Sequence, residues 1–155
     1  MLKIKIPGRS ELTLEHLVLD YNGTIAEDGF VVEGVAERLE ELKDVLSIYV
    51  ITADTHGTAA QRCAGLPLQV LTYPTVEVGQ IKAEETSRLT GGVVCIGNGF
   101  NDVLMSDAAD LSIAVIGREG ACGALLSHCD VVTTSILDAL DLLRKTDRLR
   151  ATLRT

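Results

Sequence analysis

The sequence lacks several features that would assign it to a specialised class of protein. It contains no tryptophan, and aromatic residues make up only 3% of its 155 residues, which argues against a surface that stacks nucleic-acid bases. No apolar run approaches the about 20 residues needed to span a membrane. The N-terminus also lacks the apolar core of a signal peptide. We therefore predict a cytoplasmic protein that binds no membrane.

The sequence has few cysteines, and none of them forms a CxxC pair. The four are Cys63, Cys95, Cys122 and Cys129. Cys95 stands in an apolar, strand-like run, which favours buried thiols over disulfides or a zinc site.

Positive charge is also scarce: 14 Lys and Arg face 22 Asp and Glu, which gives a net charge of -8. Such a chain repels nucleic acid, and we expect no nucleic-acid partner. The C-terminal tail, residues 144–155, is the exception, with five basic residues against one aspartate. A solvated helix is the simpler interpretation of this tail, and a docking patch is the alternative.

Short apolar runs alternate with helical patterns along the chain. The runs expected to be strands are 17–19, 45–51, 68–71, 93–96, 111–116 and 130–132. The segments expected to be helical are 33–42, 56–64, 78–89, a helix from about 102, 121–126 and 136–143. This alternation predicts an α/β fold: a three-layer, Rossmann-like parallel sheet with helices on both faces.

The chain is expected to form a single domain over residues 1–155. Residues 1–15 alternate around Pro7-Gly8 and predict an N-terminal hairpin extension. Residues 24–32 predict a small flap hairpin after the first core strand, with its tight turn at Asp28-Gly29.

Polar residues follow three of the predicted strands. Asp20 comes directly after 17–19, Thr52 after 45–51, and Asn98 after 93–96. Because the carboxyl ends of parallel strands share one edge of a sheet, these residues should meet there. A carboxylate buried at the end of a strand costs several kcal/mol unless something pairs with it.

The residues around that edge suit phosphate and a hard cation. Thr52 offers a hydroxyl, and the backbone N–H groups next to it, at Ala53, could hold a phosphate. Lys82, near the start of its helix, could neutralise the phosphate. The loop "GNGFND", residues 97–102, carries oxygen donors suited to Mg²⁺. Each feature alone is weak, but their order along the chain is specific.

In this order of motifs the sequence resembles the haloacid dehalogenase superfamily of phosphatases and phosphotransferases. The family's four motifs are matched by "LVLDYNGT", by "YVIT" ending at Thr52, by Lys82, and by "GNGFND". The match to the "DxxGT" frame and the loop is most similar to the phosphorylation domain of P-type ATPases and their small soluble relatives.

This resemblance implies a hydrolase that transfers phosphoryl groups in two steps. Asp20 would attack phosphorus and form an aspartyl-phosphate. Thr52, Ala53, Lys82 and Asn101 would hold the phosphate. The catalytic positions would be Asp20, Asn22, Thr52 and Lys82. The Mg²⁺ ligands would be Asp20, the Asn22 carbonyl, Asn98 and Asp102, with Asp102 either holding the metal's water shell or orienting Lys82.

Two positions depart from the family pattern. Family phosphatases carry a general acid/base aspartate where Asn22 stands, and an amide cannot exchange a proton near neutral pH. Since general acid–base catalysis contributes about 10²–10⁴-fold, slow hydrolysis is expected. Asn98 replaces an aspartate that usually binds the metal, which removes a negative charge. The alternative is therefore a catalytically weak module that binds Mg²⁺, phosphate or a protein partner.

The spacing of the motifs leaves no room for a cap domain. The site should be open to a phosphorylated small molecule or macromolecule, unless a second copy of the chain covers it in a homo-oligomer. His56 is an alternative proton donor, although a helix-first-turn or surface histidine is the simpler interpretation. Glu27 and Asp28 of the flap are further alternatives, although flap carboxylates are most often just solvated. Tyr21 and Phe100 flank the proposed site, where packing is the simpler role and contact with a substrate or partner the alternative.

Overall fold

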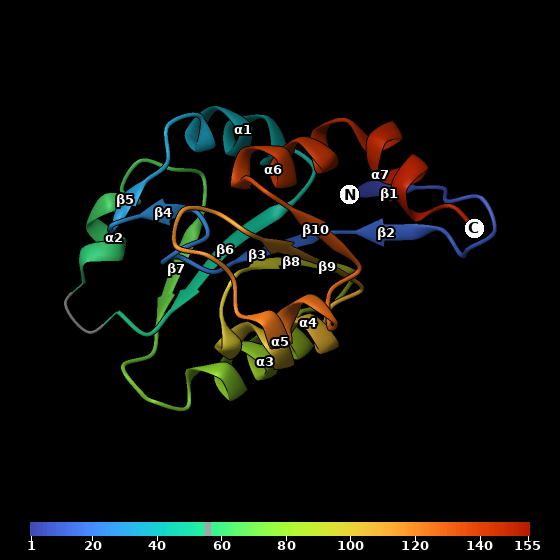
Figure 1. The fold of residues 1–155 in the computed structure, drawn as a ribbon. Helices are drawn as coiled ribbons and strands as arrows, with labels where there is room; N and C mark the ends of the chain where they lie inside the picture. The colour runs from blue at the N-terminus through green and yellow to red at the C-terminus, as the bar shows by residue number, and fades with distance from the viewer. Residues whose placement is uncertain (55–56) are drawn as a thin grey trace.

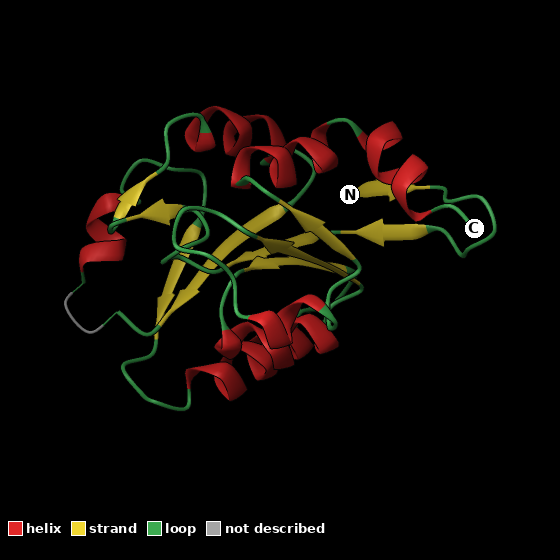
Figure 2. Cartoon of the chain, in the orientation of Figure 1, coloured by secondary structure: helices red, strands yellow, loops and turns green. Residues whose placement is uncertain are grey.

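A computed structural model describes residues 1–54 and 57–155 as an α/β fold around one parallel sheet (Figures 1 and 2). The six strands lie in the order β10-β9-β8-β3-β6-β7, and every pair is parallel. Their bounds are β3 His16–Leu19, β6 Ser47–Thr52, β7 Gln69–Thr72, β8 Val93–Gly97, β9 Leu111–Val115 and β10 Val131–Thr133.

Helices cover both faces of this sheet, as Figure 1 shows. On one face lie α1 Val35–Leu42, α6 Ile136–Arg144 and α7 Thr146–Leu153. On the other face lie α3 Val78–Arg88, the short 3₁₀ helix η1 Phe100–Asp102, α4 Val103–Ala108 and α5 Gly123–Leu126. The remaining helix, α2 Thr58–Arg62, lies beside the flap. The predicted three-layer, Rossmann-like fold is confirmed, and none of the described helices has the length and apolarity that crossing a membrane requires.

The central strand β3 separates two hydrophobic cores. Leu17 and Leu19 belong to the larger core under α1, α6 and α7. Val18 points to the other face and joins a smaller core with Cys95 and Met105. Because successive strand residues alternate between faces, a strand covered on both sides must be apolar throughout. This is why the run before Asp20 carries no alternating pattern.

Several predicted elements are shorter than the apolar patterns suggest, and hydrogen bonds explain the later start of two of them. Strand β6 begins at Ser47 rather than at residue 45, because the backbone N–H groups of Val45 and Leu46 both donate to the carbonyl of Leu42 in the turn after α1. Helix α5 begins at Gly123, because the N–H of Cys122 instead donates to the Asn98 carbonyl at 2.8 Å. That bond ties the start of α5 to the loop after β8.

The predicted N-terminal hairpin is present, with β1 Leu2–Ile4 antiparallel to β2 Leu12–Leu14. The C-terminal tail forms α7 beside it, and the N–H of Thr155 donates to the carbonyl of Pro7 at 3.2 Å. Leu149 and Leu153 of α7 are buried in the larger core. The tail is therefore helical as predicted, but only one of its faces is solvated.

The flap is a hairpin of β4 Ala26–Glu27 and β5 Phe30–Val31. Its turn places Asp28 at φ 50° and Gly29 at φ 84°, the left-handed pair that a tight two-residue turn requires. The Tyr21 hydroxyl donates to the Gly29 carbonyl at 2.7 Å, and Nη1 of Arg62 donates to the same oxygen at 3.0 Å. These bonds fix the flap to β3 and to α2.

All four cysteines are free thiols, as expected. Cys63 and Cys95 are buried, and burial raises the pKa of the Cys95 thiol well above its usual range.

Candidate active site

The strand order brings the predicted site residues to one edge of the sheet. Strand β3 pairs with β6 on one side and with β8 on the other, so that Leu19 lies opposite both Val50 and Ile96. The residues that follow, Asp20, Thr52 and Asn98, therefore face a common cavity of about 600 Å³. Its described walls are Asp20, Asn22, Thr52, Ala53, Asp54, Lys82, Asn98, Gly99, Phe100 and Asn101.

The ammonium group of Lys82 is the centre of this site. Lys82 is only 1% exposed. Its Nζ donates to Oδ1 of Asp20 at 2.7 Å and to Oδ1 of Asp102 at 2.8 Å. A third, longer bond of 3.3 Å goes to Oδ1 of Asn101. Burial opposes the charge on Lys82, but the two carboxylates outweigh burial and raise the pKa of Lys82.

Asp20 is held at both of its carboxylate oxygens. Besides the Lys82 contact at Oδ1, its Oδ2 accepts a hydrogen bond from the Thr24 hydroxyl at 3.2 Å. Burial raises the pKa of Asp20 to about 7, and the nearby Asp102 carboxylate adds to this rise, while Lys82 opposes it. Two carboxylates therefore share one ammonium group, which leaves an excess of one negative charge when both are ionised.

Asp102 is fully buried, and both of its oxygens are engaged. While Oδ1 accepts from Lys82, Oδ2 accepts from the backbone N–H groups of Asn98 at 3.1 Å and Gly99 at 3.0 Å. The loop can close this tightly because residue 97 is glycine: a Cβ there would lie 2.5 Å from Cγ of Asp102. Asp102 thus links the loop after β8 to the buried lysine.

Thr52 and Ala53 form the opposite wall of the cavity. Thr52 is buried, and its hydroxyl oxygen accepts from the N–H of Asp54 at 3.2 Å. The hydroxyl hydrogen makes no bond to any described residue. Oδ2 of Asp54 in turn accepts from the N–H of Ala59, in the first turn of α2, at 2.7 Å.

The three asparagines of the site differ in their surroundings. The side chain of Asn98 is held on both sides: its Oδ1 accepts from Thr24 at 3.2 Å and its Nδ2 donates to the Gly120 carbonyl at 3.0 Å. Asn101 is exposed and its Oδ1 accepts from Lys82 at 3.3 Å, while Asn22 is exposed and its amide bonds to no described residue.

Thr24 and Asp54 belong to the site but were not predicted from the sequence as site residues. Thr24 is 2% exposed and is the only described residue whose side chain bonds to both Asp20 and Asn98. Its position as the last residue of "DxxGT" could have identified it. Asp54 lines the cavity two residues after Thr52, which on the sequence alone indicates a helix cap.

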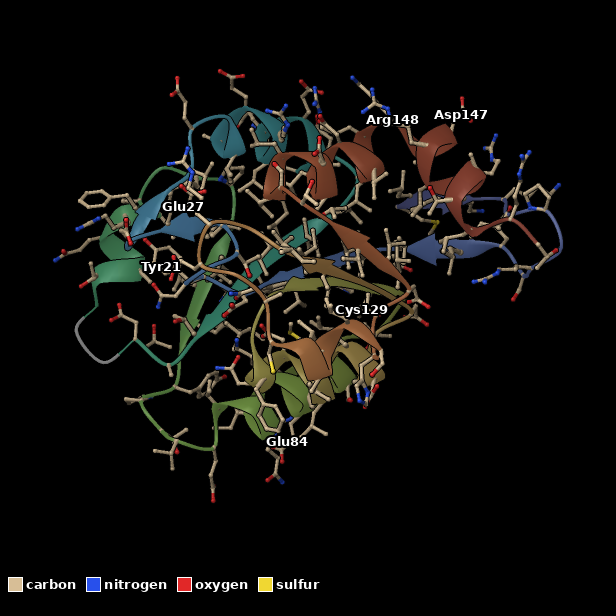
Figure 3. The ribbon with its side chains drawn as sticks, viewed as in Figure 1. Tyr21, Glu27, Glu84, Cys129, Asp147 and Arg148 are labelled. Carbon is tan, nitrogen blue, oxygen red and sulfur yellow. The ribbon has the colours of Figure 1, made fainter. Side chains whose placement is uncertain are left out.

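The two flanking aromatic residues have different roles. Tyr21 is 2% exposed and belongs to the larger core, and Figure 3 places it near the flap. Phe100 lines the cavity and is 73% exposed. His56, the alternative proton donor, lies outside the described residues.

The oxygen atoms gathered here suit a hard cation. Asp20 Oδ2 and Asn98 Oδ1 lie 3.2 Å from the same Thr24 hydroxyl, so carboxylate and amide oxygens converge beside the excess negative charge. Within residues 1–54 and 57–155 no group of three or more His, Cys, Asp or Glu side chains is arranged to hold a metal. A cation here would depend on Asp20 together with amide, backbone and water oxygens, which is the chemistry of Mg²⁺.

Two archaeal proteins match the sequence closely. The uncharacterised protein MJ0073 of Methanocaldococcus jannaschii is 50% identical over 62 residues, which are 40% of this chain and 67% of that protein. MJ0072 of the same organism is 56% identical over 39 residues, 25% of this chain and 89% of that protein. The chain belongs to the family of these two proteins. No protein-family model matches its sequence.

Solved structures relate this family to the haloacid dehalogenase fold. The cobalt-bound deoxy-D-mannose-octulosonate 8-phosphate phosphatase of Haemophilus influenzae superposes with a TM-score of 0.72 at 13% identity, over 92% of this chain and 94% of that one. The Moraxella catarrhalis enzyme, in complex with magnesium, phosphate and KDO, gives 0.64 at 15% identity, over 92% and 94%. A zinc-transporting PIB-type ATPase gives 0.64 at 21% identity, over 79% of this chain and 20% of the ATPase.

These similarities show the fold, and the connections between strands show which version of it this chain has. Between β3 and β6 lie the flap and α1, and the described residues between β6 and β7 form α2 alone. Neither connection holds a cap domain in the described part of the chain. The fold is a capless haloacid dehalogenase fold.

Proposed function

We propose that this protein is a Mg²⁺-dependent phosphohydrolase or phosphotransferase that acts through an aspartyl-phosphate at Asp20. The observation that carries the proposal is the buried Lys82 ammonium, 2.7 Å from Asp20 Oδ1 and 2.8 Å from Asp102 Oδ1, at the floor of a cavity on the carboxyl edge of the sheet. A buried charge cluster of this kind is costly for stability. Its position in a cavity instead favours a role in chemistry.

In this proposal the chain's own residues hold the phosphoryl group and the nucleophile. Lys82 and Thr24 fix the two oxygens of Asp20, so that the carboxylate is oriented before the substrate binds. The Thr52 hydroxyl, the Ala53 N–H and the Asn101 amide line the cavity and can donate to phosphate oxygens. Lys82 offsets the charge that gathers on the phosphoryl oxygens.

The magnesium ligands in this proposal are Asp20, the Asn22 carbonyl and Asn98. When bound, the ion supplies positive charge next to the phosphoryl group. Asp102 has both oxygens occupied by Lys82 and by backbone N–H groups. Of its two expected roles, orienting Lys82 therefore fits better. In the other role, Asp102 would contact the metal only through its water shell.

The direct test is release of phosphate from p-nitrophenyl phosphate. We expect slow turnover that stops in EDTA and returns with Mg²⁺, because the site holds too little positive charge for a phosphate dianion without the ion. Metal binding without turnover of any phosphate compound would instead support the alternative, a weak Mg²⁺- or phosphate-binding module. The replacements at Asn22 and Asn98 are the observation that favours that alternative.

Magnesium should stabilise the protein more at pH 8 than at pH 5.5. The pKa of Asp20 is raised to about 7, so protons compete with the cation for this carboxylate at the lower pH. At a concentration about 100 times the dissociation constant, a ligand adds ~2.7 kcal/mol, which raises the melting temperature by about 5–10 °C. Thermal melts with Mg²⁺ and with EDTA at both pH values measure this. Equal shifts at the two pH values, or an undiminished shift in Asp20→Asn, would contradict the assignment of Asp20 as a ligand.

The open cavity is compatible with a small or a macromolecular phosphorylated substrate. Because Phe100 is exposed at its wall, we also propose that a second copy of the chain could cover the site. A comparison of activity and oligomeric state across protein concentrations tests this.

A further inference from the structure

Asn22 stands in the cavity wall at the position where, by the resemblance to the haloacid dehalogenase phosphatases, the acid for the leaving group would be. It lies two residues after Asp20, lines the same cavity, and its exposed amide bonds to no described residue. Its backbone is fixed by a bridge to Ala26 at the start of the flap. The side chain is therefore free to approach a substrate but carries no proton that it can transfer near neutral pH.

The other ionisable groups in the described walls are already engaged. The Nζ of Lys82 bonds to three oxygen atoms and is buried. Asp54 uses a carboxylate oxygen to accept from the N–H of Ala59 in α2. Asp102 is not among the residues that line the cavity; it is fully buried, and both of its oxygens are occupied.

The carboxylates of the flap do not replace the missing acid. Glu27 and Asp28 are not among the described residues that line the cavity. Glu27 lies 3.7 Å from Arg118, and the N–H of Asp28 donates to Glu119 at 3.2 Å. Figure 3 places Glu27 on the flap, above Tyr21. The described site therefore offers an activated nucleophile without a proton donor for the group that departs.

Resting on the proposed function, we infer that the substrates are phosphate compounds whose leaving group departs without taking up a proton. Acyl phosphates, the mixed anhydrides of a carboxylic acid and phosphoric acid, are the class that fits best. In the first step an oxygen of Asp20 bonds to phosphorus, and the bond from phosphorus to the leaving oxygen breaks. Both electrons pass to that oxygen, which leaves as a stable carboxylate. Water then attacks phosphorus, the electron pair returns to Asp20, and both water protons leave with the phosphate.

The charge of the cavity narrows the class of possible substrates further. Lys82 is the one cation in the described walls, and it already faces two carboxylates. A leaving group with further phosphates, such as a nucleoside diphosphate, would find no side-chain cation in these described walls beyond Lys82. Alkyl phosphates, including sugar phosphates, are excluded by the missing proton donor, because an alkoxide is too basic to leave unprotonated.

The test is the dependence of kcat/KM on the basicity of the leaving group. We would measure kcat/KM for acetyl phosphate, for a series of aryl phosphates from dinitrophenyl to phenyl phosphate, and for glycerol phosphate. Mg²⁺ would be present throughout. In the wild-type protein we expect kcat/KM to fall steeply along the series, with acetyl phosphate near the top. In Asn22→Asp the slope should become shallow, with a gain of about 10²–10⁴-fold for glycerol phosphate and little gain for acetyl phosphate.

A matched variant separates proton transfer from added charge. Gln61→Glu places the same new carboxylate on an exposed position of α2, outside the cavity, and should leave the slope unchanged. A shallow slope in the wild-type protein would overturn the inference. If that slope became steep in His56→Gln, the proton donor would be His56. Absence of turnover and of phosphoenzyme with every compound would instead overturn the proposed function itself.

Discussion

Replacing Asp20 by asparagine should reduce phosphate release by on the order of 10⁴-fold or more while leaving the fold intact. An amide is a poor nucleophile and cannot form a stable phosphoryl ester, so the two-step route is lost rather than slowed. The shape of the side chain is kept, and Lys82 retains Asp102 as its charged partner at 2.8 Å. The loss should therefore appear in kcat and not in stability.

The stability of the Asp20→Asn variant is itself informative. Burial and the Asp102 carboxylate raise the pKa of Asp20, so the ionised carboxylate is unfavourable in the metal-free protein. Removing it should leave the metal-free protein at least as stable as the wild type at pH 8. Asp44→Asn, at an exposed position after α1, is the control and should leave the rate unchanged. A variant that folds normally and keeps more than a tenth of the rate would remove Asp20 from the mechanism.

Replacing Lys82 by methionine should destabilise the metal-free protein by about 3–5 kcal/mol at pH 8. Two buried carboxylates, Asp20 and Asp102, would then face each other without a cation. The effect should be smaller at pH 5.5, because Asp20 takes up a proton there and one of the two charges disappears. The direction of this pH effect follows from the pKa of Asp20, which is raised to about 7. The folded state takes up protons as pH falls, so the destabilisation caused by ionised Asp20 grows as pH rises.

Urea unfolding in EDTA at the two pH values measures this effect. Lys43→Met is the matched control, because the same change removes a lysine that pairs with Glu40 on the exposed surface. Exposed pairs contribute about 0–1 kcal/mol, so this variant should differ little from the wild type at either pH. A Lys82 variant as stable as the Lys43 variant would mean that the buried cluster is not charged as described.

The sequence predicts which strand ends meet at one edge of the sheet, because that arrangement depends on chain topology. Buried parallel strands read as apolar runs, and their carboxyl ends share an edge of the sheet. From this alone Asp20, Thr52 and Asn98 were expected together, and they line one cavity. Lys82 approaches from a helix on one face of the sheet, and its distance from Asp20 could not have been predicted from spacing along the chain.

The contacts within the site were not predictable, because they depend on side-chain packing between distant segments. Thr24 bonds to Asn98, which is 74 residues away, and nothing local in either segment indicates the other. The two oxygens of Asp102 are divided between a lysine on α3 and two backbone N–H groups of its own loop. A motif predicts that an acid is needed there, but not which of its oxygens remain available.

The packing of the C-terminal tail was also not predictable from the sequence alone. Its five basic residues predict solvation, but Leu149 and Leu153 are spaced four apart and are buried beside the N-terminal hairpin. Figure 3 shows Asp147 and Arg148 on α7, far from Tyr21 and the flap. Only two of these basic residues, Arg148 and Arg150, lie on α7 itself, and only the fold determines which apolar surface that helix covers.

Capture of the phosphorylated protein tests the central claim most directly. The chain would be mixed with acetyl phosphate and Mg²⁺, quenched in acid, digested and analysed by mass spectrometry. We predict that one peptide, the one containing Asp20, gains the mass of a single HPO₃ group, that hydroxylamine removes it, and that Asp20→Asn shows none. Phosphate release without this adduct, or an adduct at another residue, would contradict the account.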